Sequence, residues 1–266
     1  MAHLFDTHQR IVPTWLAASR YLLDQPSYMG RNMLLEIANP IDLTEEDLDI
    51  LRAISAALTR NTYGLTIETV AGTIFPQGLY TRHGREQLYS AYQQVIERAK
   101  KRGTWGTYFD RMTNRVSPEG DHVNPLDDLI EKLKRSAKPG QRVYQSVYEL
   151  CASDPAVDLA QAEMGGELST YEPIHDRRYL RGGPCLSHLS FKISERSNLD
   201  LTAMYRSHDY CARALGNLLG LSRLLRFVAN ESGLAAGTLS CLSTHAELEF
   251  SSWGGPASGK ELLSSL

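Results

Sequence analysis

The sequence predicts an α+β fold in which a large, mainly antiparallel sheet carries helices against one face. This prediction rests on the order of patterns along the chain. Helical periodicity dominates the first half, strand-like alternation dominates the second half, and one long apolar helix follows most of the strands. No shift in composition marks a domain boundary, so we expect residues 1–266 to form one domain.

The first half contains an early strand over residues 31–37 and several helices. An amphipathic helix follows the strand, with Thr44 as its candidate N-cap and acidic residues in its first turn. Two further helices are predicted over 84–103 and 124–136 from their spacing of apolar residues. Residues 66–76 fit either a helix or a strand.

The second half alternates between apolar and polar residues, which is typical of half-buried strands. Strands are predicted over 141–151, 184–194, 199–207 and 237–250. A long helix over 209–233, ended by Gly233, separates the last two of these strands. We expect the small and polar tail, residues 251–266, to be loosely held.

Composition excludes several classes of protein. The 266 residues are 42% hydrophobic and 22% charged, with a net charge of −3, which disfavours a nucleic-acid-coating protein. No apolar run is long enough for a membrane helix, and the first residues carry no apolar leader. The four cysteines show no paired spacing, so we expect neither a disulfide scaffold nor a metal site. These features predict a cytoplasmic protein with no nucleic-acid or membrane partner.

Cys185 stands where a turn becomes a predicted strand, in "RGGPCLSHLSFKIS". The ordinary interpretation is a small buried side chain. However, the Gly-Gly-Pro turn restricts the direction in which the backbone enters the strand. The first residue of such a strand can point into a cleft. A nucleophilic thiolate at that point needs a positive neighbour.

A candidate phosphate site follows on the next strand and helix. Arg206 and Ser207 precede Asp209 at the predicted helix start, where free backbone N–H groups attract anions. Alternatively, Ser207 or Asp209 simply caps the helix. Asn217 lies further along this apolar helix, where its amide must find partners. Those partners are either the edge of a nucleobase or the nearby backbone.

These residues in combination resemble thymidylate synthase. Cys185 follows a proline, "RSHD" spans Arg206 to Asp209, and Asn217 follows on the helix, as in that family's pattern. The resemblance is good over 184–248 and looser over 105–150. It implies a thymidylate synthase-like fold whose sheets pair in a homodimer. It also implies an enzyme that transfers a methyl or hydroxymethyl group to carbon 5 of a pyrimidine.

The resemblance also implies roles for single residues. The substrate would be a pyrimidine nucleoside monophosphate, and 5,10-methylenetetrahydrofolate would supply the one-carbon unit. The catalytic residues would be Cys185 as nucleophile, Glu68 in proton transfers, and Tyr108. The nucleotide would be bound by Arg206, Ser207, Asn217, Arg142 from the partner subunit, His245, Glu247 and Arg31. Asp209 would contact the pterin of the reduced folate. Each of three residues also has a structural interpretation. Glu68 could be an acid on the surface, and Tyr108 and His245 could be core residues.

The chain departs from the family at several positions. Leu186 replaces the histidine after the nucleophile, and Arg213 stands where the family has glycine. Glu247 replaces a tyrosine beside the sugar, and a carboxylate there would favour a ribose. The chain after His245 is short, which would leave the one-carbon intermediate open to water and favour a hydroxymethyl product. Asn217 favours uracil over cytosine. Two alternatives stay open: a nucleotide-binding relative without catalysis, and a folate-independent reaction at carbon 5.

Overall fold

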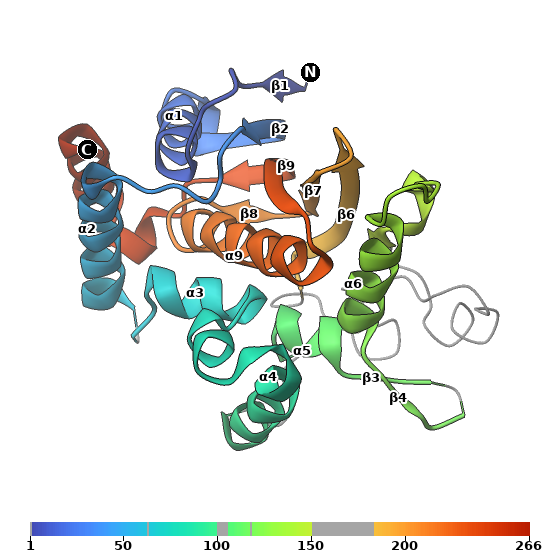
Figure 1. Ribbon diagram of the computed structural model, residues 1–266. Coiled ribbons are helices and arrows are strands. Elements are labelled where there is room, and N and C mark those ends of the chain that lie inside the picture. Colours follow the sequence, from blue (N-terminus) through green and yellow to red (C-terminus); the bar gives the residue numbers. More distant parts are fainter. Residues whose placement is uncertain (1, 63, 100–105, 118, 151–183) are drawn as a thin grey trace.

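The computed structural model describes residues 2–62, 64–99, 106–117, 119–150 and 184–266 (Figure 1). A seven-stranded sheet lies at its centre, in the order β1-β2-β9-β7-β6-β5, with β8 beside β9. Its strands are β1 (His3–Leu4), β2 (Met29–Ile37), β5 (Glu149–Leu150), β6 (Leu186–Ser194), β7 (Asn198–Tyr205), β8 (His208–Asp209) and β9 (Ala235–Glu247). A separate hairpin joins β3 (Arg115–Val116) to β4 (His122–Val123).

The sheet is mixed, so the prediction of a mainly antiparallel sheet is confirmed only in part. β2 pairs antiparallel with β9, and β6 pairs antiparallel with β7. The central pair, β7 and β9, is parallel because α9 (Ala214–Ser232) lies between them in the chain as a crossover. The α+β class itself is confirmed.

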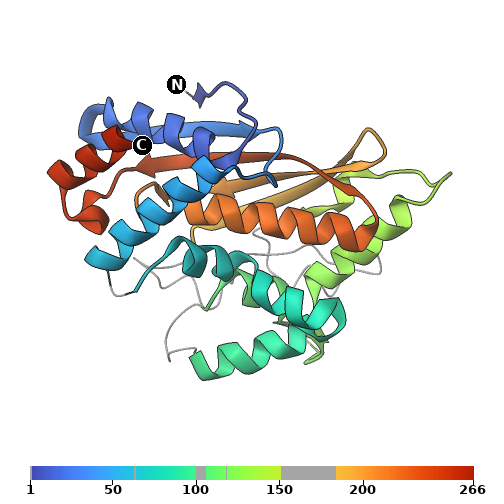
Figure 2. The same ribbon diagram turned by 60° about the vertical axis from the view of Figure 1, so that its left-hand side comes forward.

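The helices of the described residues lie mainly on one side of the sheet. They are α1 (Ile11–Leu23), α2 (Glu45–Asn61), α3 (Ile67–Ile74), α4 (Gln77–Ala99), α5 (Tyr108–Thr113), α6 (Pro125–Ser136), α9 and α10 (Pro256–Ser265). Figures 1 and 2 show α9 lying along the sheet, with α3 to α6 beyond it. Short 3-10 turns occur at η1 (Pro26–Tyr28), η2 (Gln145–Val147) and η3 (Phe250–Trp253).

Two glycines let α3 and α9 approach closely. A Cβ added at Gly216 would lie 2.6 Å from the Cβ of Val70. One added at Gly220 would lie 2.8 Å from the carbonyl oxygen of Ala71. Both distances are far below van der Waals contact, so only glycine fits at this helix crossing.

The two faces of the sheet differ in burial. The apolar side chains predicted to share one face of β7 are all buried: Leu199, Leu201, Ala203 and Tyr205. Residues at alternate positions point the other way and stay partly or fully exposed, among them Ser190, Lys192 and Thr202. The core therefore lies between one face of the sheet and the helices.

Several local predictions are confirmed. Thr44 caps α2 and forms a reciprocal capping box with Asp47. Residues 66–76, which fitted either a helix or a strand, contain α3. The helix predicted over 84–103 matches the second part of α4, which breaks at Gly84 (φ 64°, ψ 179°). Residues 100–103 of that prediction lie outside the described residues.

Three predictions were wrong. Residues 141–144 have no regular structure, η2 follows, and strand pairing there is limited to β5 among the described residues. Residue 151 lies outside the described residues. The long helix starts at Ala214 rather than near 209, because His208 and Asp209 pair with β9 as a strand. The tail is well packed rather than loosely held, since it contains η3 and α10 with Trp253 and Leu263 buried. The sequence patterns also gave no prediction for α1.

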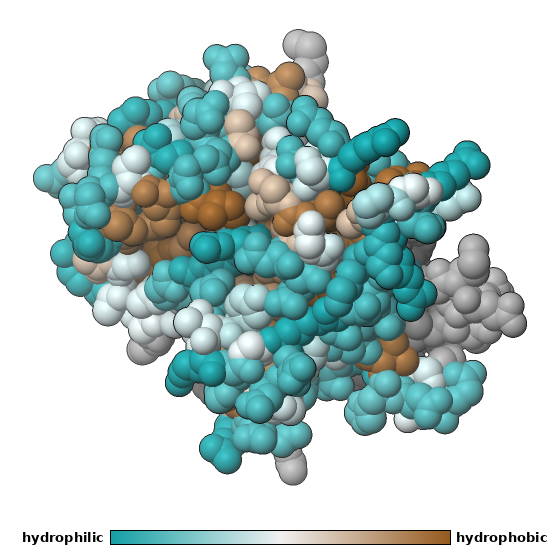
Figure 3. All heavy atoms as spheres, viewed as in Figure 1, coloured by the Kyte–Doolittle hydropathy of each residue, from teal (hydrophilic) through white to brown (hydrophobic). Residues whose placement is uncertain are grey.

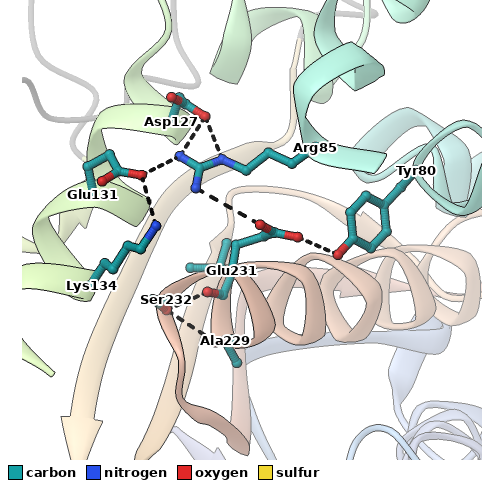
Figure 4. A network of polar contacts seen from close by, with 9 residues as sticks. Tyr80, Arg85, Asp127, Glu131, Lys134, Ala229, Glu231 and Ser232 are labelled. Atoms are coloured by element: carbon teal, nitrogen blue, oxygen red, sulfur yellow. Dashed lines mark hydrogen bonds and ion pairs between the residues drawn. The ribbon is translucent and has the colours of Figure 1, made fainter. Parts of the chain in front are cut away.

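A polar network joins three helices (Figure 4). The guanidinium of Arg85, on α4, donates to Asp127 and Glu131 of α6 at 2.9 Å each. It also lies 4.0 Å from Glu231 of α9, which accepts a hydrogen bond from Tyr80 at 2.5 Å. Paired and hydrogen-bonded charges of this kind fix the relative positions of helices.

Most apolar side chains of the described residues are buried in the core. Figure 3 shows a mainly hydrophilic face on which hydrophobic residues gather in a band across the middle. None of the helices in the described ranges combines the length and apolar character that a membrane crossing requires.

Candidate active site

Cys185 begins the site at the entrance to β6, where it is half-buried. Its carbonyl accepts a hydrogen bond of 2.9 Å from the backbone N–H of Arg206, which follows β7 directly. The Arg206 guanidinium is also within hydrogen-bonding reach of the Cys185 thiol. The antiparallel pairing of β6 and β7 therefore brings the predicted nucleophile and its predicted cation together.

Opposing effects act on the Cys185 thiol. Burial raises its pKa above the ordinary value for cysteine, whereas the guanidinium groups of Arg206 and Arg213 act to lower the pKa. The Glu247 carboxylate is close enough to add to the increase. Thus the effect of burial outweighs that of the two guanidinium groups, and the thiol is predominantly protonated near pH 7.

Tyr108 holds the same segment by hydrogen bonds to its backbone. It is the first residue of α5, and its buried hydroxyl oxygen accepts hydrogen bonds from the backbone N–H groups of Cys185 at 2.9 Å and Leu186 at 3.2 Å. Burial raises the pKa of Tyr108 to about 12, so the phenol keeps its proton at neutral pH. The predicted active-site tyrosine therefore contacts the backbone of the predicted nucleophile.

Arg213 is a site residue that sequence reasoning missed. It was noted only as a departure from a family pattern, yet the turn between β8 and α9 brings its charge near Cys185 and Tyr108. The sequence carried no signal for this position, because a turn and a strand replace the start of the predicted helix. We call Cys185, Tyr108, Arg206, Arg213 and Glu247 the Cys185 cluster.

The end of β9 contributes two further predicted residues. His245 Nε2 lies 3.6 Å from a carboxylate oxygen of Glu247, and both side chains are about one third exposed. Arg31 on β2 is directly opposite His245 in the strand register. The structure therefore gathers these three predicted sugar- and phosphate-binding residues at one end of the sheet.

Asp209 pairs with Glu247 in the parallel register of β8 and β9. Burial raises the pKa of Asp209 to about 6, although backbone N–H groups, including that of Cys211 at 2.9 Å, favour the ionised form. The Asp209 carboxylate thus caps the turn before α9 rather than α9 itself, whose N-cap residue is Arg213. Ser207 is half-buried between Arg206 and this strand.

Asn217 is buried in the first turn of α9. Its amide nitrogen lies 3.1 Å from Nε2 of His208, and the other ring nitrogen lies 2.9 Å from the Ser243 hydroxyl. The partner of the amide is therefore a side chain rather than the backbone. His208 was not predicted as a site residue, and its position inside the "RSHD" run was the one signal for it.

Two predicted residues make other contacts. Glu68 forms a bidentate ion pair with Arg223, at 2.7 and 2.8 Å, and its side chain is 68% exposed. Arg142 lies over the ring of Tyr144 and lines a cavity of about 790 Å³ that includes Ile193. Ile193 is at the opposite end of β6 from Leu186, about 23 Å away at the usual rise of a strand. Neither residue contacts the Cys185 cluster within the described chain.

Chemically, the arrangement combines a thiol, two guanidinium groups, a buried amide and a set of carboxylates. Guanidinium groups bind phosphate, and a thiol beside them is a candidate for nucleophilic addition. An amide presents a donor and an acceptor side by side, as the edge of a base does. The described residues therefore offer groups for each part of a nucleotide.

Comparison with known proteins identifies relatives of one kind. No protein-family model matches the chain. The chain is 37% identical over 173 residues to a protein of Methanosarcina barkeri named "Putative thymidylate synthase", a match that covers 65% of this chain and 66% of the relative. A protein of the same name from Methanococcoides burtonii is 40% identical over 70 residues, or 26% of this chain and 32% of the relative.

A third protein of that name, from Methanothermobacter marburgensis, is 26% identical over 207 residues, or 76% of this chain and 78% of the relative. The matches to the first two relatives span only a third to about two thirds of their lengths. The α+β fold, with its mixed sheet and covering helices, is compatible with these names. The chain belongs to the thymidylate synthase-like superfamily.

Proposed function

We propose that this protein transfers a one-carbon unit from 5,10-methylenetetrahydrofolate to carbon 5 of a pyrimidine nucleoside monophosphate. The observation that carries this proposal is the position of Arg206 and Arg213 beside the Cys185 thiol, with Tyr108 holding the backbone of the same residue. The names of the relatives point to the same class of transferase.

The proposed reaction starts with Cys185. The thiolate forms a bond to carbon 6 of the ring, and the electrons of the 5,6 double bond move onto carbon 5 and the carbonyl, giving an enolate. Carbon 5 would then bond to the one-carbon unit as one bond between that carbon and a folate nitrogen breaks. Loss of the proton from carbon 5 would expel tetrahydrofolate and leave an exocyclic methylene group on the ring. Addition of a hydride from tetrahydrofolate, or of water, to that methylene and release of the Cys185 thiolate from carbon 6 would restore the ring. Glu68 is proposed to assist the proton transfers, although it is paired with Arg223 in this structure.

The nucleotide is proposed to lie across the Cys185 cluster. Arg206, Arg213 and Ser207 would bind the phosphate. His245 and Glu247 would bind the sugar, with Arg31 beside them. A carboxylate accepts two hydrogen bonds at once, which suits the two hydroxyl groups of a ribose. Turnover of UMP or CMP above that of dUMP or dCMP would support a ribonucleotide substrate, and a strong deoxy preference would contradict it.

Folate binding is proposed at Asp209. A half-buried carboxyl with its pKa raised to about 6 can accept hydrogen bonds when ionised and donate one when protonated, which fits the mixed donors and acceptors of a pterin. The folate would supply the one-carbon unit. The product, methyl or hydroxymethyl, depends on whether hydride or water completes the transfer.

A homodimer is proposed through the open face of the sheet. On that face Leu34 is opposite Leu242, which is opposite Met204, and all three are half-buried. A row of apolar side chains across three neighbouring strands favours a sheet-to-sheet contact. Such a dimer would let Arg142 act on the phosphate of the partner subunit.

Tritium release from nucleotides labelled at carbon 5 tests the proposal. The expected result is folate-dependent release that is lost in Cys185→Ser and reduced more than tenfold in Glu68→Gln. Unchanged release in Glu68→Gln would remove Glu68 from the mechanism. The exposed ion pair contributes at most about 1 kcal/mol to stability, so a loss of turnover reports on chemistry.

A second candidate function is nucleotide binding without turnover. The raised pKa of Cys185 favours it, because a protonated thiol is a weak nucleophile. If the protein binds the nucleotide but releases no tritium with or without folate, nucleotide binding without turnover is its function. Release without folate would instead identify a folate-independent reaction at carbon 5.

A further inference from the structure

The imidazole of His208 is held rigidly between two polar side chains. Its Nε2 lies 3.1 Å from the amide nitrogen of Asn217, and its Nδ1 lies 2.9 Å from Oγ of Ser243. The ring stacks on Tyr205, with centroids 4.1 Å apart and planes inclined by 5°. His208 is 1% exposed, so neither ring nitrogen can exchange its partner for water.

This geometry specifies one tautomer. An amide nitrogen only donates, so Nε2 of His208 accepts and carries no proton. Nδ1 therefore carries the proton and donates it to Ser243. Burial lowers the pKa of His208 to about 3, which keeps the ring neutral at physiological pH. Turning the Asn217 amide over would require the proton to move to Nε2 and Ser243 to become the donor, so the three side chains change only together.

The rest of the Asn217 amide is available. Within the described part of the chain, His208 is the hydrogen-bond partner recorded for this side chain, which leaves Oδ1 and one N–H unmatched. The residue is 5% exposed, and neither polar atom of its amide is among the fully enclosed side-chain atoms that lack a hydrogen-bond partner in the described residues. The unmatched groups lie on the first turn of α9, directly after Arg213 and its turn. A ligand at the Cys185 cluster is the natural partner for them.

We propose that His208 is a positioning residue that fixes the orientation of the Asn217 amide and so makes the site discriminate between uracil and cytosine. This inference rests on the proposed function, because it needs a pyrimidine at the Cys185 cluster. Uracil presents a donor at N3 beside an acceptor at carbon 4, and cytosine presents the reverse. A fixed amide matches one order and opposes the other with like groups. An amide that could turn over would accept both bases.

The test compares binding of UMP, dUMP, CMP and dCMP by titration calorimetry. Wild-type protein is expected to prefer one base by at least about a hundredfold. His208→Phe keeps a ring against Tyr205 but removes both nitrogens, and it is expected to reduce the preference to below about threefold with a smaller loss of affinity. His208→Gln, whose amide oxygen can accept from Asn217, should restore part of the preference. Tyr205→Phe preserves the stack and should leave the preference unchanged.

A second measurement uses the unaltered protein, in case His208→Phe does not fold. The ¹⁵N shifts of the imidazole are expected to show a protonated Nδ1 and an unprotonated Nε2. A proton on Nε2, or an unchanged base preference in folded His208→Phe, would overturn the inference. Tritium release by the wild type separates the two proposals: intact release with an unchanged preference overturns the role of His208 alone, whereas absence of all nucleotide binding overturns both.

Discussion

The hydroxyl oxygen of Tyr108 lies 2.9 Å from the backbone nitrogen of Cys185 and accepts its hydrogen bond. A short helix from the first half of the chain thereby holds the start of a strand from the second half. The same oxygen accepts from Leu186, so one phenol satisfies two successive N–H groups, those of Cys185 and Leu186. The orientation of the thiol therefore depends on a contact between distant parts of the sequence.

Tyr108→Phe removes this acceptor without changing the ring. The loss of a buried partner for N–H groups is expected to lower the free energy of unfolding by about 1–3 kcal/mol, measured by urea denaturation. Tyr21→Phe is a matched control, because its hydroxyl has no hydrogen bond recorded among the described residues, and it should change stability by less than about 0.5 kcal/mol. Equal effects of the two variants would contradict a supporting role for Tyr108.

Arg206→Met tests the electrostatics of the thiol. Burial raises the pKa of Cys185 and the Arg206 guanidinium lowers it. Without the guanidinium the pKa should therefore rise further. Because each pKa unit reduces the thiolate fraction tenfold, alkylation of Cys185 at pH 7.5 should slow by about tenfold. Arg52→Met, at an exposed ion pair with Asp49, should leave the rate unchanged. Peptide mapping by mass spectrometry follows Cys185 separately from the buried Cys211 and Cys241.

Asp209→Asn tests the buried carboxyl. Because the folded-state pKa is raised to about 6, the wild type is most stable below the pKa of the unfolded chain and loses stability as the pH rises through 6. Asparagine imitates the protonated acid. The variant should therefore gain about 1–3 kcal/mol relative to wild type between pH 4 and pH 7.5, measured by chemical denaturation at each pH. Asp49→Asn should show no such gain, and a pH-independent difference for Asp209→Asn would contradict the assignment.

Gly220→Ala tests the close crossing of α3 and α9. The added methyl group would meet the carbonyl of Ala71 at 2.8 Å and the Cβ of Ile74 at 2.9 Å, so the helices must separate. We expect a loss of about 1–3 kcal/mol in spite of the better helix propensity of alanine. Gly72→Ala is the control, because its methyl group would meet no atom within 4 Å, and it should stabilise the protein by up to about 1 kcal/mol. Stabilisation by both variants would mean that the helices are not in contact.

Local signals in the sequence predicted much of the fold. The alternation of β6 and β7, the cap at Thr44 and the stop at Gly233 each depend on neighbouring residues, and each is present in the structure. The tail was mispredicted because its order comes from a distant contact. Trp253 packs edge-on against Trp15, with ring centroids 6.3 Å apart, and composition alone carries no sign of that pairing.

The candidate site likewise contains residues that the local sequence predicted and residues whose roles depend on the tertiary fold. Cys185, Arg206 and Asn217 were predicted from their order along the chain, and the pairing of β6 with β7 explains why the first two meet. Arg213 and His208 were missed because their roles depend on a turn and a strand that replace the start of the predicted helix. The parallel pairing of β7 with β9 was missed for a similar reason, since a crossover is a property of the whole topology.

Covalent capture of a fluorinated nucleotide would show whether Cys185 adds to carbon 6 of a pyrimidine. The protein would be incubated with 5-fluoro-UMP or 5-fluoro-dUMP, each with and without 5,10-methylenetetrahydrofolate, and analysed by intact-mass and peptide mass spectrometry. We expect a stable adduct of nucleotide and folate on Cys185 that is absent in Cys185→Ser. A protein that binds these nucleotides but forms no adduct on Cys185 under any of these conditions would contradict it.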